Sequence, residues 1–216
     1  MTSKEEIIFF DVDTQNDFMN TDGKLYVTGA ENIKENLGKL TQYARMQEIR
    51  ILGSVDYHSL EDSEIESENP DYSKTFPPHC MQNSSGQEKI IETRSDIANW
   101  IDSVKYSEEK IEEIVSSKGP IFFRKDNFDS FSNPNSTTIL KTLKPKKVVV
   151  YGVAIDYCVK SAIDGFLKLK DQDIFLVVDA VEGIEEEKSK NLIKEWVEKG
   201  VRTVTTEGIL QGALLE

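Results

Sequence analysis

Short apolar runs alternate with longer segments of helical periodicity along most of this chain. The apolar runs predict strands at residues 7–10, 49–55, 121–123, 146–153, 174–178 and 201–205. Between them, a spacing of three to four residues between apolar positions predicts helices at residues 31–46, 156–169 and 189–199. Strands that alternate with helices indicate right-handed βαβ units and a parallel sheet.

The predicted fold is α/β, with a doubly wound, mostly parallel sheet and helices on both faces, as in a Rossmann-like three-layer sandwich. The continuous apolar run at residues 148–151 is typical of a strand that is buried on both faces. No repeat or low-complexity linker divides the chain, so we expect a single domain over residues 1–216. A long loop at residues 56–87 interrupts the alternation, and long loops often carry function.

The composition indicates a soluble protein without a nucleic-acid or membrane partner. Hydrophobic residues make up 38% of the chain and charged residues 30%, and the net charge is −13. This charge argues against binding to a nucleic-acid backbone or an anionic membrane surface. No apolar run is long enough to cross a bilayer, and from the polar residues 1–6 we expect no signal peptide. Two widely separated cysteines form no disulfide framework, so we expect a cytoplasmic location.

Chemically active residues follow four of the predicted strands. Asp13 follows the first, residues 56–58 (DYH) the second, Lys125 the third, and residues 152–158 (GVAIDYC) the fourth. Ligands of parallel sheets bind outside the carboxyl ends of the strands. These residues therefore bring a carboxylate, two metal-ligand types, an ammonium group and a thiol to one edge of the sheet.

Cys158 is the candidate nucleophile, because it opens the predicted helix at residues 156–169. A helix N-terminus and the nearby Lys125 ammonium would both lower the pKa of the thiol, and a carboxylate can accept its proton. The backbone N–H groups of Ala154 and Cys158 can form an oxyanion hole. Taken alone, a buried core cysteine is the commoner interpretation. The convergence of the other strand ends favours catalysis.

A metal site is predicted from the two histidines of the chain, His58 and His79, which lie in or beside the long loop. Asp56 and His58 point to the same side of an extended segment, and His79 can return from the loop to join them. Such ligands suit Zn²⁺, Fe²⁺ or Mn²⁺, and zinc is our first choice. Glu64 is a candidate fourth ligand. Solvated surface histidines are the alternative.

Two residues resemble site residues without a clear role. Cys80 neither follows a predicted strand nor opens a helix, so we interpret it as structural. Asp11 alternates with Asp13 on a strand and shares its face. The strand pattern does not decide which of the two reaches the thiol.

The ordered motifs of this chain resemble those of the isochorismatase-like cysteine hydrolases, and within that superfamily they are most similar to the nicotinamidases. The resemblance covers nearly the whole chain from residue 7 onward. Its motifs are residues 13–18 (DTQNDF), 56–58 (DYH), 77–80 (PPHC), Lys125 and residues 152–159 (GVAIDYCV).

This resemblance implies a catalytic triad of Asp13, Lys125 and Cys158, with Asp13 rather than Asp11 as the acidic member. It also implies a cis peptide bond between Val153 and Ala154, which presents the Ala154 N–H to the oxyanion.

For the substrate pocket, the resemblance implies metal ligation by Asp56, His58 and His79, and the fourth ligand of the family falls near Glu64. The metal would bind the pyridine nitrogen of the substrate. Aromatic walls around the substrate ring would be Phe18 and Phe76.

Three departures from the nicotinamidase pattern concern the substrate. Phe76 stands where Trp is common, Ile155 where Thr is common, and residues 83–85 (NSS) replace the usual Gly-Thr. Our hypothesis is conversion of nicotinamide to nicotinate and ammonia. The alternatives are an amidase for another small amide or carbamoyl compound on the same triad, and a non-catalytic metal- or ligand-binding scaffold. The expected partners are the small amide and further copies of this chain in a homo-oligomer.

Overall fold

The computed structural model describes residues 6–214 apart from residue 171. Within this part of the chain, seven strands form one sheet in the order β3-β4-β2-β1-β5-β6-β7. Every neighbouring pair is parallel, which confirms the predicted fold class. The strands are β1 (Ile7–Val12), β2 (Arg50–Asp56), β3 (Asn99–Ile101), β4 (Ile121–Lys125), β5 (Lys147–Val153), β6 (Asp173–Glu182) and β7 (Arg202–Val204).

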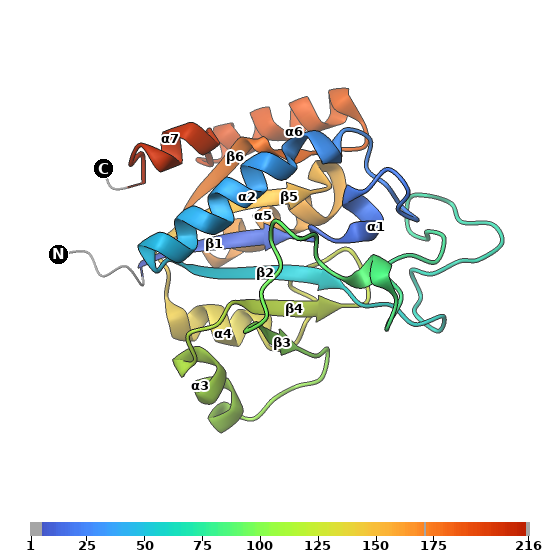
Figure 1. Ribbon diagram of the computed structural model, residues 1–216, viewed down its shortest axis with the longest axis horizontal. Coiled ribbons are helices and arrows are strands. Elements are labelled where there is room, and N and C mark those ends of the chain that lie inside the picture. Colours follow the sequence, from blue (N-terminus) through green and yellow to red (C-terminus); the bar gives the residue numbers. More distant parts are fainter. Residues whose placement is uncertain (1–5, 171, 215–216) are drawn as a thin grey trace.

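Helices connect the strands and cover both faces of the sheet (Figure 1). The crossover from β1 to β2 runs towards the β3 edge, whereas the crossovers from β4 onward run towards the β7 edge. Because such crossovers are right-handed, α2 lies on one face and α4 and α5 lie on the other. The helical elements are α1 (Asn16–Met19), α2 (Ala30–Gln47), η2 (Ser85–Gln87), α3 (Glu108–Ser116), α4 (Ser136–Leu143), η3 (Ile155–Val159), α5 (Lys160–Leu169), α6 (Glu186–Glu198) and α7 (Thr206–Leu210).

The core lies between the sheet and its helices. Val148, Val149 and Val150 of β5 are fully buried, as the continuous apolar run predicts. On α2, the predicted apolar positions Ile33, Leu37, Leu40 and Ala44 are buried, together with Ala30 and Thr41. None of the helices in the described chain is long and apolar enough to cross a membrane.

Several elements differ from the prediction, which contained none of the helices α1, α4 and α7. The edge strand β3 was not predicted, because its three residues are too few to show a period of apolar and polar positions. β6 continues to Glu182, since a register shift between Val150 and Gly152 of its neighbour lets pairing resume beyond residue 178. The helix that carries Cys158 starts with the π-helical turn η3 before α5 begins.

The carboxyl ends of the central strands position the candidate site. β1 ends one residue before Asp13, while Asp56 and Lys125 are the last residues of β2 and β4 and pair with each other in register. β5 ends at Val153, just before η3. Gly152 of β5 has φ +117°, and a Cβ there would lie 2.0 Å from the Val12 carbonyl oxygen. A glycine is therefore needed for β1 and β5 to approach each other at this edge.

Candidate active site

Lys125 lies buried at the centre of the site and contacts three acidic groups. Its Nζ lies 2.9 Å from Asp13 Oδ2 and 3.7 Å from Cys158 Sγ. It also donates a hydrogen bond to Asp56 Oδ1. The structure thus brings the predicted Asp13, Lys125 and Cys158 together, and it adds Asp56 to the same ammonium group.

The loop that follows β1 fixes the carboxylate of Asp13. Asp13 has a positive φ of 49°, and its N–H donates to the Ser54 carbonyl oxygen of β2 at 3.1 Å. The Ser54 hydroxyl donates to Asp13 Oδ1 at 2.7 Å, and Ser130 donates in turn to the Ser54 hydroxyl at 3.0 Å. One carboxylate oxygen is therefore held by β2, which leaves Oδ2 directed to Lys125.

The charges of the site stabilise one another. Burial alone would favour a neutral Lys125, but Asp13 and Asp56 hold the pKa of this ammonium group well above its usual range. Although burial opposes it, Lys125 holds the pKa of Asp56 well below the usual value. Burial raises the pKa of Asp13, and the opposing effect of Lys125 does not cancel this rise. Asp13 is therefore a stronger proton acceptor than an ordinary aspartate.

Cys158 lies in the turn η3 with 7% of its surface exposed. The expectation of a lowered thiol pKa is wrong for this chain. Burial raises the pKa of Cys158 well above its usual value, and Lys125 opposes this only in part. A carboxylate oxygen of Asp13 lies within 4.8 Å of the Cys158 sulfur. A nucleophilic Cys158 must therefore give its proton to a neighbouring base, and Asp13, whose pKa is raised, is the neighbouring carboxylate suited to accept it.

The backbone next to the thiol has the form that the family resemblance implies. The peptide bond between Val153 and Ala154 is cis, and both Ala154 and Cys158 line the same pocket. The use of the Ala154 and Cys158 N–H groups as an oxyanion hole stays a prediction.

Four buried side chains next to Lys125 form a candidate metal centre. Asp56, His58, Glu64 and His79 each offer one ligand atom, and these atoms all lie within 4.8 Å of one another. Asp56 directs Oδ1 to Lys125, while its Oδ2 lies 3.7 Å from His58 Nε2 and 3.4 Å from His79 Nε2. The three predicted ligands and the candidate Glu64 are thus found together.

Hydrogen bonds on the far side of each imidazole orient the lone pair that faces the cluster. His58 Nδ1 lies 3.1 Å from Asp62 Oδ2, and His79 Nδ1 lies 2.8 Å from the Pro77 carbonyl oxygen, which can only accept. Neutral rings in these contacts carry the proton on Nδ1 and present Nε2 to the cluster. Asp62 was not predicted from the sequence, where its only signal is its position four residues after His58.

Unpartnered atoms in the cluster test whether a cation fits it. His58 Nε2 and Glu64 Oε2 are buried without a hydrogen-bond partner among the described residues, which is uncommon in folded proteins. Burial and the charge of Asp56 raise the pKa of Glu64 to about 7. A divalent cation would satisfy both atoms and oppose the repulsion between the two carboxylates. Imidazole and carboxylate donors suit Zn²⁺, Fe²⁺ or Mn²⁺, so these residues fit such an ion.

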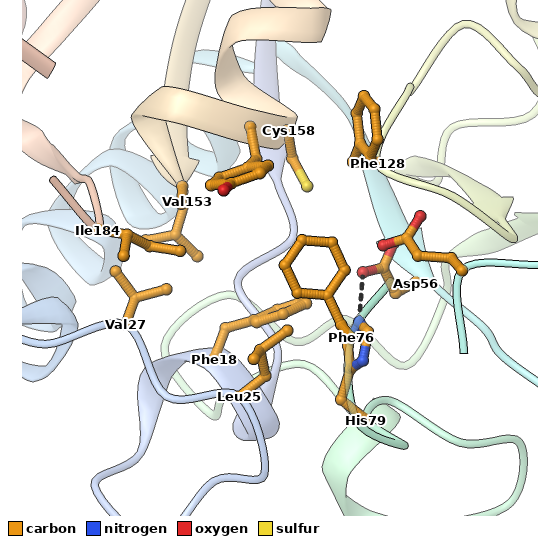
Figure 2. Close-up of a pocket in the computed structure, with 13 residues that line it drawn as sticks. Phe18, Leu25, Val27, Asp56, Phe76, His79, Phe128, Val153, Cys158 and Ile184 are labelled. Atoms are coloured by element: carbon orange, nitrogen blue, oxygen red, sulfur yellow. Dashed lines mark ion pairs between the residues drawn. The ribbon is translucent and has the colours of Figure 1, made fainter. Parts of the chain in front are cut away.

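A pocket lies between the thiol and the candidate metal centre (Figure 2). Figure 2 shows the Cys158 sulfur directed towards the side on which Asp56 and His79 lie. The pocket encloses about 390 Å³ with its open mouth included, at the small end of the range for small-molecule sites. Phe18 and Phe76 line it as predicted. Its further apolar lining residues are Leu25, Val27, Phe128, Val153, Tyr157 and Ile184.

The sequence carried a signal for some of these further lining residues. Ile184 follows the end of β6 at Glu182, so the rule that ligands bind at strand ends identifies it once the strand is given its full length. Phe128 follows Lys125 at the end of β4 in the same way. Leu25 and Val27 lie in a turn-rich connection and have no such signal.

Gln15 was also missed as a site residue, although it lies in the motif after Asp13. Its fully buried side chain binds both sides of the Asp56 peptide backbone. Gln15 Nε2 donates to the Asp56 carbonyl oxygen at 2.8 Å, and Gln15 Oε1 accepts from the Asp56 N–H at 2.7 Å. Gln15 therefore fixes the residue that joins Lys125 to the candidate metal centre.

Asp11 and Cys80 have other partners. Asp11 Oδ2 lies 3.0 Å from Lys89 Nζ, and Asp11 Oδ1 accepts from Thr14 Oγ1 at 2.8 Å. The strand ends before Asp13, so regular alternation does not place the two aspartates in equivalent positions. Cys80 is buried, and its N–H donates to Asp17 Oδ2 at 2.7 Å, which supports its interpretation as structural.

Comparison with known proteins gives one family across the chain. The isochorismatase domain matches residues 8–208. A curated relative, the nicotinamidase/pyrazinamidase of Mycobacterium tuberculosis, is 28% identical over 160 residues, which cover 71% of this chain and 74% of the relative.

Solved structures show the same fold. The pyrazinamidase/nicotinamidase from Streptococcus mutans superposes with a TM-score of 0.71 at 21% identity, over 92% of this chain and 99% of that one. The pyrazinamidase of Pyrococcus horikoshii in complex with zinc gives a TM-score of 0.69 at 23% identity, over 93% and 99%. At these identities the likeness concerns the fold alone.

Proposed function

The chain belongs to the isochorismatase family, and we propose that it is a metal-dependent cysteine amidohydrolase that converts nicotinamide to nicotinate and ammonia. The observation that carries this proposal is the position of Lys125. Its ammonium group touches Asp13, Cys158 and Asp56 at once. Lys125 therefore joins the candidate acid–base residue Asp13 and the candidate nucleophile Cys158 to the candidate metal centre beside one pocket.

In the proposed reaction, Asp13 accepts the proton of Cys158 as the sulfur attacks the amide carbonyl carbon. Lys125 stabilises the developing thiolate, which burial disfavours. The N–H groups of Ala154 and Cys158 would receive the carbonyl oxygen as it becomes negative. Asp13 then returns the proton to the departing nitrogen, and ammonia leaves a thioester on Cys158. Water attacks the thioester carbon and gives a proton to Asp13. As the carbon–sulfur bond breaks, Asp13 returns this proton to the sulfur, which restores the thiol and releases the carboxylic acid.

The metal ligands in this proposal are Asp56, His58, His79 and Glu64, and zinc is the first choice of ion. A bound divalent cation would supply an open position for the ring nitrogen of the substrate. The structural neighbour from Pyrococcus horikoshii is a pyrazinamidase in complex with zinc, which supports this assignment. The apolar walls at Phe18 and Phe76 suit a flat aromatic ring, which would leave its amide carbon facing Cys158.

An ammonia-release assay with zinc-loaded protein and nicotinamide tests the proposal. We expect turnover that is lost in Cys158→Ala, since no other group among the described site residues can form the thioester. Protein with full metal content and no turnover of nicotinamide would contradict the substrate. A fully active Cys158→Ala would contradict the mechanism.

The second candidate, an amidase for another small amide on the same triad, has one observation in its favour. Phe76 forms the wall where nicotinamidases commonly carry Trp, so the pocket differs there. A panel of small amides and carbamoyl compounds, assayed with and without a chelator, separates the two. Metal-independent turnover of a compound without a ring nitrogen would favour the second candidate, whereas chelator-sensitive turnover of nicotinamide favours the first.

A further inference from the structure

Residues 65–76, which we call the flanking segment, connect the candidate ligand Glu64 to the stretch that carries His79. The segment projects beyond the carboxyl ends of the strands, where the chain is teal in Figure 1. Its last residue, Phe76, forms one wall of the pocket. The position of the flanking segment therefore shapes the pocket opposite Cys158.

Hydrogen bonds make both ends of the flanking segment stiff. At its base, the Phe76 N–H donates to the Glu64 carbonyl oxygen at 2.8 Å, and the Glu66 N–H donates to the Phe76 carbonyl oxygen at 2.9 Å. At its tip, Asp71 Oδ1 accepts from the N–H groups of three successive residues, Ser73, Lys74 and Thr75. The tip is therefore braced internally and the base is closed by its own bonds, so a single contact to the rest of the molecule can hold the tip.

Tyr157 provides that contact. Its hydroxyl donates to the Tyr72 carbonyl oxygen at 2.9 Å, and among the described residues this is the one hydrogen bond between residues 67–75 and the chain outside the flanking segment. The Tyr157 ring also packs edge-on against Phe76, with 5.6 Å between ring centroids. Tyr72, which belongs to the flanking segment, packs edge-on against Phe76 as well, with 6.4 Å between ring centroids. The Phe76 ring thus contacts both Tyr157 and Tyr72.

We propose that Tyr157 is a positioning residue that fastens the flanking segment and thereby keeps Phe76 against the pocket. Although Tyr157 precedes Cys158 in the sequence, its hydroxyl points to the segment and has no contact with Lys125 or Asp13 among the recorded hydrogen bonds of the described residues. Its effect falls on substrate binding and not on the chemistry at the thiol. The kinetic part of this inference rests on the proposed function, but the structural part does not.

Tyr157→Phe tests the proposal, because it removes the hydroxyl and keeps the ring. Lys74 is the single basic residue of the flanking segment, so trypsin cleavage after Lys74 reports detachment of the tip. The rate of cleavage follows the fraction of molecules in which the tip is detached. Loss of one solvent-exposed hydrogen bond should raise this fraction, so trypsin should cleave Tyr157→Phe roughly three- to fivefold faster than the wild type. KM for nicotinamide depends on the fraction of molecules in which the tip is attached. This fraction falls by a smaller factor than the detached fraction rises, so KM should increase by up to roughly twofold.

Three properties of Tyr157→Phe should equal those of the wild type: kcat, metal content and the midpoint of thermal unfolding. The base of the segment stays closed without the hydroxyl, so Glu64 and His79 keep their places. Tyr106→Phe is the matched control. It also removes a hydroxyl that is hydrogen-bonded to backbone, here to the N–H of Asp102, but it lies outside the pocket and should leave cleavage after Lys74 and KM unchanged.

Wild-type cleavage or wild-type KM in Tyr157→Phe would overturn the proposal. So would a lower kcat or a loss of metal, since these would assign Tyr157 to the chemistry or to the metal centre. If the wild-type protein releases no ammonia from nicotinamide, the proposed function fails, yet the cleavage rates still decide whether Tyr157 holds the segment.

Discussion

Two buried lysines lie beside the end of β1, and their surroundings differ. Lys125 Nζ lies 2.9 Å from Asp13 Oδ2, and Lys89 Nζ lies 3.0 Å from Asp11 Oδ2. Neither ammonium group is exposed. Because the two ion pairs are alike in distance and burial, a buried Lys–Asp pair does not by itself indicate catalysis.

The difference lies in the remaining partners. Lys89 is completed by the Thr14 hydroxyl at 2.8 Å and by the ring of Phe122, 4.5 Å from its Nζ. One positive charge therefore meets one negative charge, and the pair is neutral. Lys125 instead meets two carboxylates and a thiol. Its surroundings keep a surplus of negative charge, which can hold a proton on Asp13 or a cation beside Asp56.

The comparison teaches that an unbalanced ion pair at a pocket marks the site, whereas a balanced one holds the fold together. The Asp11–Lys89 pair ties β1 to the end of the long loop and lines no part of the pocket in Figure 2. It fixes the backbone next to Asp13 without contact to the thiol. Substitutions at the two pairs should therefore affect different properties.

The largest expected effect is the contrast between Asp13→Asn and Asp11→Asn. Asp13→Asn removes the proton acceptor of Cys158, so kcat should fall roughly 10²- to 10⁴-fold. Asp11→Asn leaves the acceptor in place, and kcat per folded molecule should stay close to the wild-type value. Ammonia release at saturating nicotinamide measures both variants. A matching loss of kcat in Asp11→Asn would remove the distinction between the two pairs.

Asp11→Asn should instead lower stability, by about 3–5 kcal/mol, because it leaves the Lys89 charge buried without a counter-ion. The double variant Asp11→Leu with Lys89→Met replaces the whole pair by apolar groups and should recover most of that loss. Urea unfolding of the folded, metal-loaded proteins gives the free energies. If the double variant is as unstable as the single one, the loss of stability does not come from the unpaired Lys89 charge, and the pair stabilises the fold through its other contacts.

The sequence predicted the charges of the site better than its walls. Val148, Val149 and Val150 show a buried strand directly, and residues at strand ends such as Asp13 and Lys125 must meet at one edge of a parallel sheet. The topology therefore brings Lys125, Cys158 and an aspartate of the first strand to one edge before any coordinates are known, together with Asp56 and His58. The difference between Asp11 and Asp13 was not predictable from the strand pattern, since it depends on where β1 ends and on Lys89, 78 positions further along the chain than Asp11.

The other missed features depend on contacts between distant segments. Tyr157 reaches Tyr72 across 85 positions, and Gln15 reaches Asp56 across 41. No local period encodes such pairs. The π-helical turn before α5 and the three-residue strand β3 are too short to give a pattern of their own. The raised pKa of the Cys158 thiol was also not predicted. Burial raises this pKa more than the nearby Lys125 ammonium group lowers it, and the burial of a single residue cannot be inferred from the sequence.

The candidate metal centre is the second feature that separates the two lysines, and Asp62→Asn tests it. Asp62 accepts from His58 Nδ1 and so directs Nε2 to the cluster. Loss of such a partner typically lowers metal affinity roughly 10- to 100-fold. Competition for zinc with an indicator dye measures this without any substrate. The exposed neighbour Glu61, as Glu61→Gln, is the control, and equal affinities in the two variants would contradict the assignment of His58 as a ligand.

The smallest expected effect concerns the aromatic ring beside each lysine site. Phe76 lines the pocket, whereas Phe122 lies under Lys89. A stacked or edge-on ring contact contributes about 0.5–1.5 kcal/mol, so Phe76→Leu should raise KM for nicotinamide roughly two- to tenfold with little change in kcat. Phe122→Leu removes a ring of the same kind from the balanced pair, and it should lower the free energy of unfolding while KM stays unchanged. If KM rises equally in both variants, the rise reflects general loosening of the fold, and Phe76 would no longer count as a wall of the substrate site.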